Sequence, residues 1–240
     1  DNLMVKGSID SVETMGLVDG PGIRYVVFLQ GCKLRCLFCH NPETWKMEEK
    51  NMTTAEELID KIKRYKNYFG KEGGVTFSGG DPLCQPEFLL ECLKQCKQEG
   101  IHTCLDTSGV GCNKEIYPEI LSYTDLVILD IKAVTPEAYK KMTGYPMKDF
   151  LEFLELCQKL EKKLWLRQVI VPGINDTEEY ILELKKYIKN IKNVERVELL
   201  PYHLYGVEKY KKLGIPYRLD GVPAMKKEDL DKLNQILQES

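Results

Sequence analysis

Three cysteines within eight residues carry the clearest chemical signal in the sequence. The segment GCKLRCLFCHN (31–41) contains Cys32, Cys36 and Cys39, a C-x3-C-x2-C pattern that directly follows a β-rich apolar stretch. Three thiolates spaced so closely in one loop can converge on a metal ion or a metal cluster. The pattern therefore predicts a metal centre at this loop.

The number of ligands separates the metals that such a loop could hold. A structural zinc ion takes four protein ligands. His40 could be the fourth, but its place next to Cys39 makes it sterically awkward for the same ion. A four-iron cluster held by three cysteines leaves one iron open, and an open coordination position is typical of a catalytic site. We expect the cluster, with zinc or three inert buried thiols as the alternatives.

The other six cysteines are predicted to fill the core or the surface. An odd total of nine cannot pair completely, and a disulfide framework is not expected without an export signal. Cys92 and Cys96 stand four residues apart in a helical pattern but lack a close third thiol. The set is Cys84, Cys92, Cys96, Cys104, Cys112 and Cys157.

The segments around the cysteine loop predict an α/β fold. Six short, largely apolar and β-rich segments suit buried parallel strands: 24–30, 74–78, 101–106, 125–131, 164–171 and 194–200. Helical patterns lie between them, at 53–69, 177–191 and 228–237 among others, and Thr53 and Thr54 offer capping boxes. Six strands, each followed by a helix, predict an open partial TIM barrel, (β/α)6, in a single domain over residues 1–240.

Polar residues follow the ends of five consecutive predicted strands. They are SGGD (78–81), DTSG (106–109), DIK (130–132), VPG (171–173) and PYH (201–203). Barrels of this kind build their sites from the carboxyl ends of the strands and the loops that follow, so we expect a site there. Arg167 lies inside an apolar strand, where it is costly to bury unpaired, and should meet a carboxylate.

Composition narrows the function classes. The chain has 240 residues, 34 basic and 37 acidic side chains and a net charge of −3, which argues against a nucleic-acid surface. A hydrophobic fraction of 43% with 30% charged residues is typical of a folded globular protein. No apolar run approaches a membrane helix, and the start DNLMVKGSID lacks the apolar core of a signal peptide. We expect a cytoplasmic protein without a membrane partner.

The cysteine motif resembles the signature of radical S-adenosylmethionine (SAM) enzymes. The stretch VDGPGIRYVVFLQGCKLRCLFCHNPETW (18–45) is similar to the activating enzymes of glycyl-radical enzymes, in the form that acts on pyruvate formate-lyase. The likeness continues through GGVTFSGGDPL, EGIHTCLDTSG, TDLVILDIK, VPGIND, VELLPYH and LDGV, so it covers nearly the whole chain. Many other activators carry an inserted ferredoxin-like segment where this chain has the cysteine-free stretch 41–58.

The resemblance implies a 4Fe–4S cluster on Cys32, Cys36 and Cys39, with SAM bound to the open iron. An electron passed through the reduced cluster would cleave SAM, and the resulting 5′-deoxyadenosyl radical would take hydrogen from a glycine of the partner. The implied partners are the glycine loop of a glycyl-radical enzyme, with pyruvate formate-lyase expected, and a flavodoxin or ferredoxin as the electron donor. A monomer is expected.

The resemblance also assigns individual residues. Gly79 and Gly80 would let backbone approach the methionine part of SAM, and Asp81 would strengthen the contact to its ammonium group, directly or through water. Phe38 and His40 would line the adenosine end, and His203 would bond the nucleoside. The other implied SAM contacts are Cys39, Asp106, Asp130, Ile131, Lys132 and Arg167. A monovalent cation would lie near Asp106, Thr107 and Asp130. Asp19, in a turn-rich segment, would meet the substrate peptide.

Structural roles compete with these assignments. Asp81 could be a plain turn residue, Asp130 and Lys132 a structural ion pair, and Asp19 a hydrogen-bonded turn carboxylate. Other functions also compete: activation of another glycyl-radical enzyme, a radical SAM reaction on a small molecule, or a zinc-binding interaction protein or electron carrier.

Overall fold

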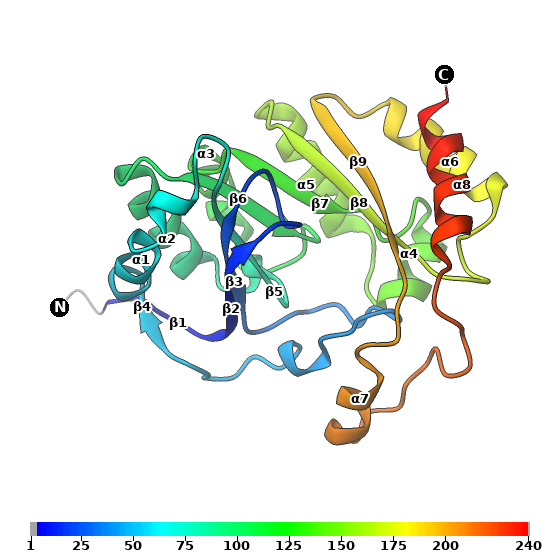
Figure 1. The fold of residues 1–240 in the computed structure, drawn as a ribbon, viewed down its shortest axis with the longest axis horizontal. Coiled ribbons are helices and arrows are strands. Elements are labelled where there is room, and N and C mark those ends of the chain that lie inside the picture. Colours follow the sequence, from blue (N-terminus) through cyan, green and yellow to red (C-terminus); the bar gives the residue numbers. More distant parts are fainter. Residues whose placement is uncertain (1–3, 240) are drawn as a thin grey trace.

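A curved seven-stranded sheet forms the centre of the computed structural model, which describes residues 4–239 (Figure 1). Its strand order is β2-β3-β5-β6-β7-β8-β9, with β2 antiparallel to β3 and every other neighbouring pair parallel. The strands are β2 Ile9–Gly16, β3 Arg24–Leu29, β5 Gly74–Gly79, β6 His102–Thr107, β7 Leu126–Asp130, β8 Leu164–Ile170 and β9 Val194–Pro201. The short strands β1 (Lys6–Gly7) and β4 (Thr53–Thr54) pair separately.

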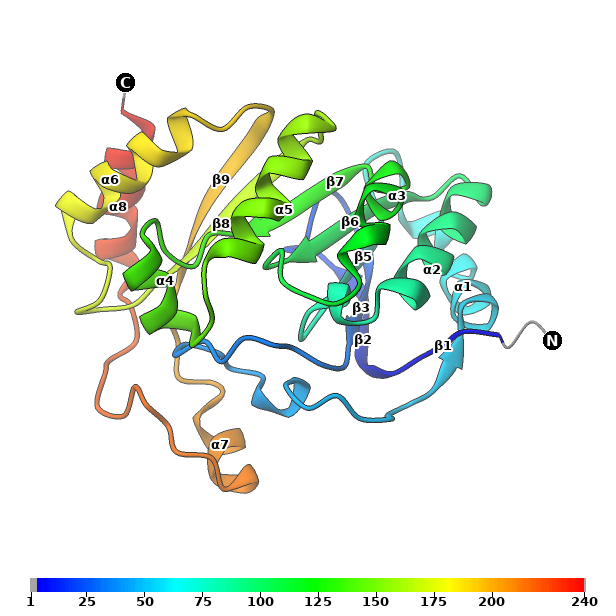
Figure 2. The ribbon, with the colours of Figure 1, turned by 180° about the vertical axis from the view of Figure 1, so that it is seen from behind.

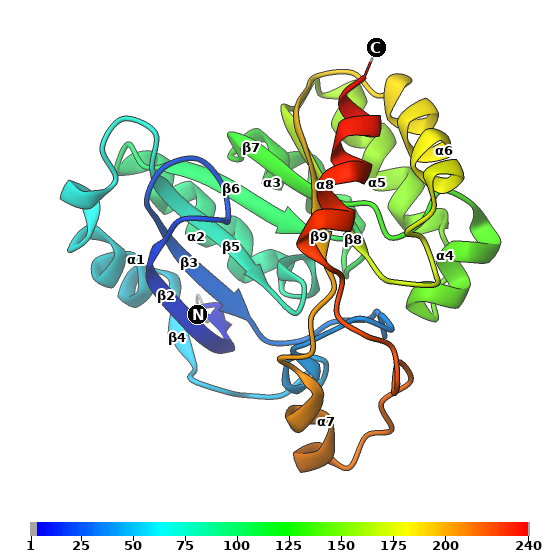
Figure 3. The ribbon, with the colours of Figure 1, turned by 45° about the vertical axis from the view of Figure 1, so that its right-hand side comes forward.

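Helices cover one face of this sheet, and its other face is concave and open (Figures 1 and 2). They are α1 Ala55–Lys63, α2 Pro86–Gln98, α3 Tyr117–Ser122, α4 Pro136–Thr143, α5 Lys148–Lys159, α6 Glu178–Lys189 and α8 Lys227–Gln238, while α7 Val207–Leu213 lies apart from the sheet, beyond the strand ends (Figure 1). The edge strands β2 and β9 do not pair with each other, so the barrel stays open on one side (Figure 3). The predicted partial barrel with six parallel strand–helix units is confirmed.

The six predicted strands are all present, and the seventh, β2, was not predicted. Its sequence IDSVETMG exposes most of its side chains, so it lacks the apolar signal of a buried strand. The expectation of burial was wrong for β9. Because β9 is an edge strand, only one of its eight residues, Leu199, is buried.

Helix boundaries follow the capping residues at their starts. Thr54 caps α1 by accepting a hydrogen bond from the Glu57 amide at 3.2 Å, and Thr177 caps α6 in the same way through Tyr180. The helix predicted over 53–69 ends earlier, at Lys63, and a 3-10 turn covers 66–68. Phe69 nevertheless packs into the core beyond that turn.

The remaining cysteines and the helix lengths agree with the sequence expectations. All nine cysteines are free thiols, and of the six outside the loop only Cys112 is not fully buried. Within residues 4–239, no helix is both long enough and apolar enough to cross a lipid bilayer.

Arg24 ties the first parallel strands together at the end of the barrel opposite the cysteine loop. Its side chain is completely buried, and its guanidinium donates to Thr76 Oγ1 at 2.7 Å and to the carbonyl oxygens of Val75 and Pro21 at 2.8 and 2.9 Å. Its remaining partners include the ring and carbonyl of His102. Arg24 has no carboxylate partner within residues 4–239, so burial lowers its pKa, and backbone dipoles hold the charge.

Replacing Arg24 should therefore destabilise the fold strongly. Arg24→Met would fill much of the volume but leave several buried carbonyls without a donor, and we expect the free energy of unfolding to fall by about 3 kcal/mol. Chemical denaturation of the two proteins measures the difference. Arg64→Met, on the exposed end of α1, is the matched control and should change stability by less than about 0.5 kcal/mol. Equal effects of the two substitutions would contradict this role.

Candidate active site at the carboxyl ends of the strands

A cavity of about 510 Å³ lies at the carboxyl ends of the parallel strands. Every residue to which the sequence assigned an individual role lines it, with one exception, whereas the strand-end stretch VPG (171–173) does not line it, since Val171 is buried in the core and Gly173 faces a different pocket. The exception is Ile131, whose side chain is buried in the core and whose amide donates to the Arg167 carbonyl at 2.7 Å. The predicted residues that line the cavity are Asp19, Cys32, Cys36, Phe38, Cys39, His40, Gly79, Gly80, Asp81, Asp106, Thr107, Asp130, Lys132, Arg167 and His203.

The cysteine loop is held in place by its own backbone and by two distant helices. It begins after β3, where the amides of Gly31 and Cys32 donate to the carbonyls of Thr44 and Trp45 at 2.7 and 3.1 Å. Farther along, the amides on either side of Cys36 donate to the last turn of α4, from Arg35 to Thr143 at 2.8 Å and from Leu37 to Met142 at 2.9 Å.

The segment before α7 and α7 itself close over the other end of the same loop. Tyr210 of α7 donates its hydroxyl to the carbonyl of Cys39 at 2.5 Å. Lys209 reaches across to Asn41 and Glu43. A Cβ added at Gly206 would come within 2.5 Å of the His40 backbone, so only glycine allows this approach. Contacts about 170 residues apart in the chain therefore fix the loop.

The three thiols of the loop line one cavity and are all free. Among residues 4–239 no three His, Cys, Asp or Glu side chains are gathered closely enough to share one metal ion. In a cluster each thiolate binds a different iron, so its ligands need not gather as closely as the ligands of a single ion.

The surroundings of the thiols favour metal-bound over free thiolate. Burial raises the pKa of Cys36 to about 11 and raises that of Cys32 and Cys39 as well. A thiol with a raised pKa stays protonated near neutral pH unless a metal supplies the opposing charge. Three thiol donors in one cavity fit a bound cluster.

Two glycines at the end of β5 bring bare backbone against the cysteine loop. Gly79 has a φ of +135°, and a Cβ there would come within 2.2 Å of the Leu29 carbonyl. A Cβ at Gly80 would come within 2.4 Å of the Gly31 carbonyl. The two loops pack so closely that no side chain fits between them. Their backbone is therefore left facing the cavity.

Asp81 is engaged by the protein itself. Its Oδ1 accepts from the Leu83 amide and the Thr107 hydroxyl at 3.0 and 2.7 Å, and its Oδ2 accepts from the amide and hydroxyl of Ser108 at 2.8 and 2.6 Å. The side chain is 1% exposed, and burial raises its pKa although all four hydrogen bonds oppose that rise. The carboxylate thus joins the loops after β5 and β6, and both of its oxygens are occupied.

Two carboxylates and an ammonium group form the charged floor of the cavity. Burial raises the pKa of Asp106 to about 7, and the neighbouring Asp130 adds to the rise. Ser78 donates to Asp106 at 2.8 Å. Lys132 pairs with Asp130 at 3.2 Å and lies 5.0 Å from the Phe38 ring. Burial alone would lower the pKa of Lys132, but Asp130 more than offsets it, so the lysine is charged.

Aromatic rings line the wall next to α7. The rings of His40 and His203 are 4.6 Å apart, and that of Tyr205 lies 4.5 Å from His203. Restricted access of water, with the nearby His203, lowers the pKa of His40 to about 4, so its ring is neutral at pH 7. The rings of His40 and His203 are tilted by 56° to each other, and they offer flat surfaces and nitrogen atoms to a bound heteroaromatic group.

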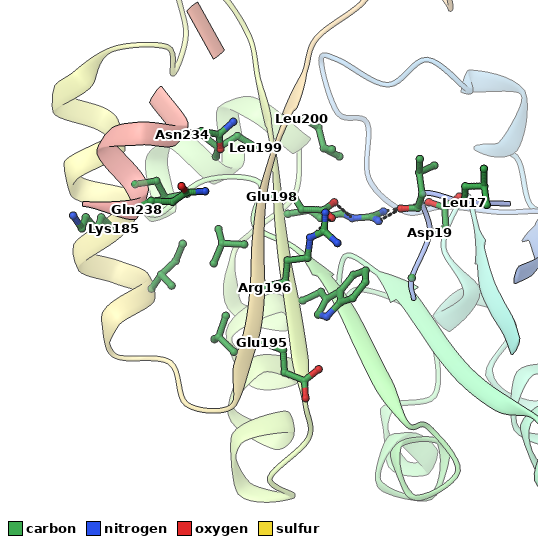
Figure 4. A pocket seen from close by; sticks show the side chains of 18 residues that line it. Leu17, Asp19, Lys185, Glu195, Arg196, Glu198, Leu199, Leu200, Asn234 and Gln238 are labelled. Carbon is green, nitrogen blue, oxygen red and sulfur yellow. Dashed lines mark hydrogen bonds and ion pairs between the residues drawn. The ribbon is translucent and has the colours of Figure 1, made fainter. Parts of the chain in front are cut away.

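A chain of ion pairs crosses the open side of the barrel (Figure 4). Arg167 of β8 contacts Asp19 at 3.2 Å and Glu198 of β9 at 3.0 Å, and Glu198 also binds Arg196 at 2.7 Å. Arg167 also donates to the Val18 carbonyl. The carboxylate expected to pair with Arg167 therefore belongs to the protein. Two residues supply one, Asp19 on one side of Arg167 and Glu198 on the other.

This chain of ion pairs separates two connected cavities. The second cavity has about 920 Å³ and is lined by the segment 17–20, by β9 and by facing residues of α6 and α8 (Figure 4). Val18, Asp19, Arg167 and Leu200 line both cavities. Leu17 and Val18, each 72% exposed, add an apolar rim. The two cavities thus adjoin at the ion pairs of Arg167.

Sequence reasoning missed the residues that hold the predicted ones. Ser78 and Ser108 lie within the polar stretches SGGD and DTSG, so a search for partners of the neighbouring aspartates could have found them. Glu198 and Tyr210 act across distances of 31 and 171 residues, and no local pattern marks them.

Comparison with known sequences identifies related proteins. Residues 26–188 match the radical SAM superfamily. The chain is 54% identical over 237 residues to "Pyruvate formate-lyase-activating enzyme" of Clostridium pasteurianum, covering 98% of this chain and 99% of that protein. A protein of the same name from Staphylococcus epidermidis is 46% identical over 227 residues, covering 91% and 90%.

Solved structures show the same fold. A domain of pyruvate-formate lyase-activating enzyme from Bacteroides vulgatus has a TM-score of 0.55 and 28% identity, covering 69% of this chain and 92% of that one. SuiB of Streptococcus suis has a TM-score of 0.66 at 20% identity, covering 88% of this chain and 44% of that one, a likeness of fold.

The hydrogen bonds of Asp81 predict a structural effect of its replacement. Asp81→Asn would set an amide NH2 against the donors of Ser108, and we expect the ligand-free protein to lose about 2–3 kcal/mol of unfolding free energy. Ser108→Ala, which removes one hydroxyl donor, should cost about 1 kcal/mol. Thermal or chemical unfolding without ligand measures both. An Asp81→Asn protein of unchanged stability that fails only in SAM binding would show a direct ligand role instead.

Proposed function

The chain belongs to the radical SAM superfamily and, within it, to the pyruvate formate-lyase-activating enzymes, and from this membership we propose roles for the residues around its cavity. It is a radical SAM enzyme of the activase type, with a 4Fe–4S cluster and SAM as cofactors and a glycyl-radical enzyme as partner. With both cofactors bound, one electron cleaves SAM to methionine and a 5′-deoxyadenosyl radical, which takes a hydrogen atom from a glycine of pyruvate formate-lyase.

Cys32, Cys36 and Cys39 hold the cluster in this proposal. The support is that these three thiols, and none of the other six, line the cavity at the carboxyl ends of the strands. Two helices hold their loop through backbone bonds, so the thiols are positioned without the metal. This single observation carries the assignment, because one iron of such a cluster is left for a ligand from the cavity.

SAM lies across the same cavity, with its polar ends at opposite walls. The bare backbone of Gly79 and Gly80 receives the amino acid part, and Asp81 supports that loop from behind. Lys132, held charged by Asp130, and the Asp106–Asp130 pair supply polar contacts, with Ile131 contributing main chain only. Phe38, His40 and His203 provide flat surfaces for the adenine base.

A monovalent cation near Asp106, Thr107 and Asp130 is a further part of the proposal. Its support is electrostatic: burial and the neighbouring Asp130 raise the pKa of Asp106, and a small cation would offset that rise. The Thr107 hydroxyl donates to Asp81 and accepts from the Gly109 amide at 3.0 Å, which leaves one lone pair to coordinate a cation.

The substrate glycine reaches SAM through the larger cavity. Asp19 is the proposed peptide contact, because it lines both cavities and its carboxylate is held by Arg167 at their junction. The walls of the two cavities also keep water away from the 5′-deoxyadenosyl radical.

A flavodoxin or ferredoxin supplies the electron, and the enzyme acts as a cytoplasmic monomer. The compartment is supported by nine free thiols, which a reducing environment preserves. All residues proposed for the site come from one chain.

Removing one loop cysteine tests the function. After anaerobic reconstitution, Cys36→Ala should lose the absorbance near 400 nm and form at least about 100-fold less 5′-deoxyadenosine from SAM, because the cluster loses a ligand. Cys112→Ala, outside the cavity, should match the parent protein in both measurements. With pyruvate formate-lyase present, the parent protein should give a glycyl-radical EPR doublet. A reconstituted parent protein that forms no 5′-deoxyadenosine would overturn the proposed function.

A further inference from the structure

Five cations surround the outer side of the cysteine loop. They form a set that we call the basic face: Lys33, Arg35, Lys140, Lys141 and Arg218. All five are exposed, and none has a carboxylate within 4.0 Å among residues 4–239. The chain as a whole carries a net charge of −3, so this concentration of unpaired positive charge contrasts with the rest of the protein.

Hydrogen bonds bring these residues together from three parts of the chain. Arg35 is at the centre: its amide donates to Thr143 at the end of α4, next to Lys140 and Lys141. Arg218 donates to the Arg35 carbonyl at 2.5 Å. Figures 1 and 2 show this tip of the loop lying between α4 and the segment that leads to α8. These contacts place Arg35, Lys140 and Arg218 side by side, with Lys33 two residues before Arg35 on the same loop and Lys141 next to Lys140 on α4.

The basic face lies directly over the cluster ligands. Arg35 is the chain neighbour of Cys36, and its guanidinium donates to the Cys32 carbonyl at 2.6 Å. Only the thickness of the loop separates this surface from the thiols. The cavities, in contrast, open on the side of Asp19 and β9, where the proposed peptide enters.

The reaction needs an electron from outside at this point. Electron tunnelling slows steeply with distance, so a donor must bind where the cluster is nearest the surface. Electron-transfer complexes are small and short-lived, and opposite charges speed their formation. A surface with unpaired lysines and arginines selects a partner with carboxylates around its redox group.

We propose that the basic face is the docking surface for the electron donor, an acidic one-electron redox protein, on the side of the loop opposite the peptide entrance. The inference rests on the proposed function, since it assumes a cluster on Cys32, Cys36 and Cys39. The inference assigns the donor a binding surface and a negative charge. It also allows the donor and the substrate to occupy the enzyme at the same time.

Charge reversal tests this surface. The test variant is Lys33→Glu/Lys140→Glu/Lys141→Glu. Arg35 and Arg218 are kept because they bind carbonyls of the cysteine loop itself, whereas Lys140 binds only the Gly144 carbonyl at the end of its own helix. The control is Lys186→Glu/Lys189→Glu/Lys192→Glu, at the far end of α6 and just beyond it, where the lysines are also exposed and unpaired among residues 4–239. Each variant changes the net charge by the same amount, three times −2, from −3 to −9.

The measurement is anaerobic stopped-flow reduction of the reconstituted cluster by a reduced flavodoxin with an acidic surface. At low salt the second-order rate constant of the test variant should fall at least about tenfold, and its dependence on salt should largely disappear. The control variant should stay within about twofold of the parent protein. Photoreduced 5-deazaflavin, a small reductant without a docking surface, should reduce all three proteins equally.

Two results would overturn the inference. One is an equal response of the two variants to flavodoxin, since net charge alone would then explain it. The other is a loss of glycyl-radical formation by the test variant with 5-deazaflavin, which would assign the face to the substrate enzyme. A parent protein that is reduced by 5-deazaflavin yet cleaves no SAM would instead refute the proposed function, so the two failures are distinguishable.

Discussion

An arginine buried in the wall of the barrel needs partners for its charge. Much of the site depends on which groups pair with Arg167. Arg167 lies on β8 with 5% exposure, and it holds Asp19 on one side and Glu198 on the other. The edge strands β2 and β9 do not pair, so backbone hydrogen bonds cannot close the barrel. Ion pairs across the gap bring the two sides together, at a place where a substrate can still enter.

The same principle organises the rest of the cavity. Charged groups at the strand ends are buried in opposite-sign or hydrogen-bonded sets, as with Asp130 and Lys132 or Asp81 and its four donors. Each set links loops that follow different strands. The pairing of buried charges therefore positions the polar side chains of the cavity. The apolar strands beneath them form the rigid base.

The sequence predicts the parts that local chemistry determines. Six strands carry a continuous apolar signal, and the three cysteines are close enough together to identify their own chemistry. The sequence does not predict β2, because most of its side chains are exposed and it therefore lacks the apolar signal of a buried strand. By contrast, β9 has the apolar sequence of a buried strand although it is an edge strand. The partner of Arg167 could be expected as a carboxylate but not named, because Asp19 is 148 residues away. Net charge likewise conceals the basic face, since its members come together only in the fold.

The way the cysteine loop is held has a consequence for the life of the protein in the presence of oxygen. Its backbone is bound by α4, by α7 and by its own flanks, so the protein has met the entropic cost of ordering the loop before any iron arrives. Zinc fingers differ, because without metal they unfold. Here none of the bonds that hold the loop involves a thiol, so we expect oxidative loss of iron and sulfide to spare the scaffold. Damage at the centre is then repairable by reassembly in place, and the cell need not synthesise the polypeptide again.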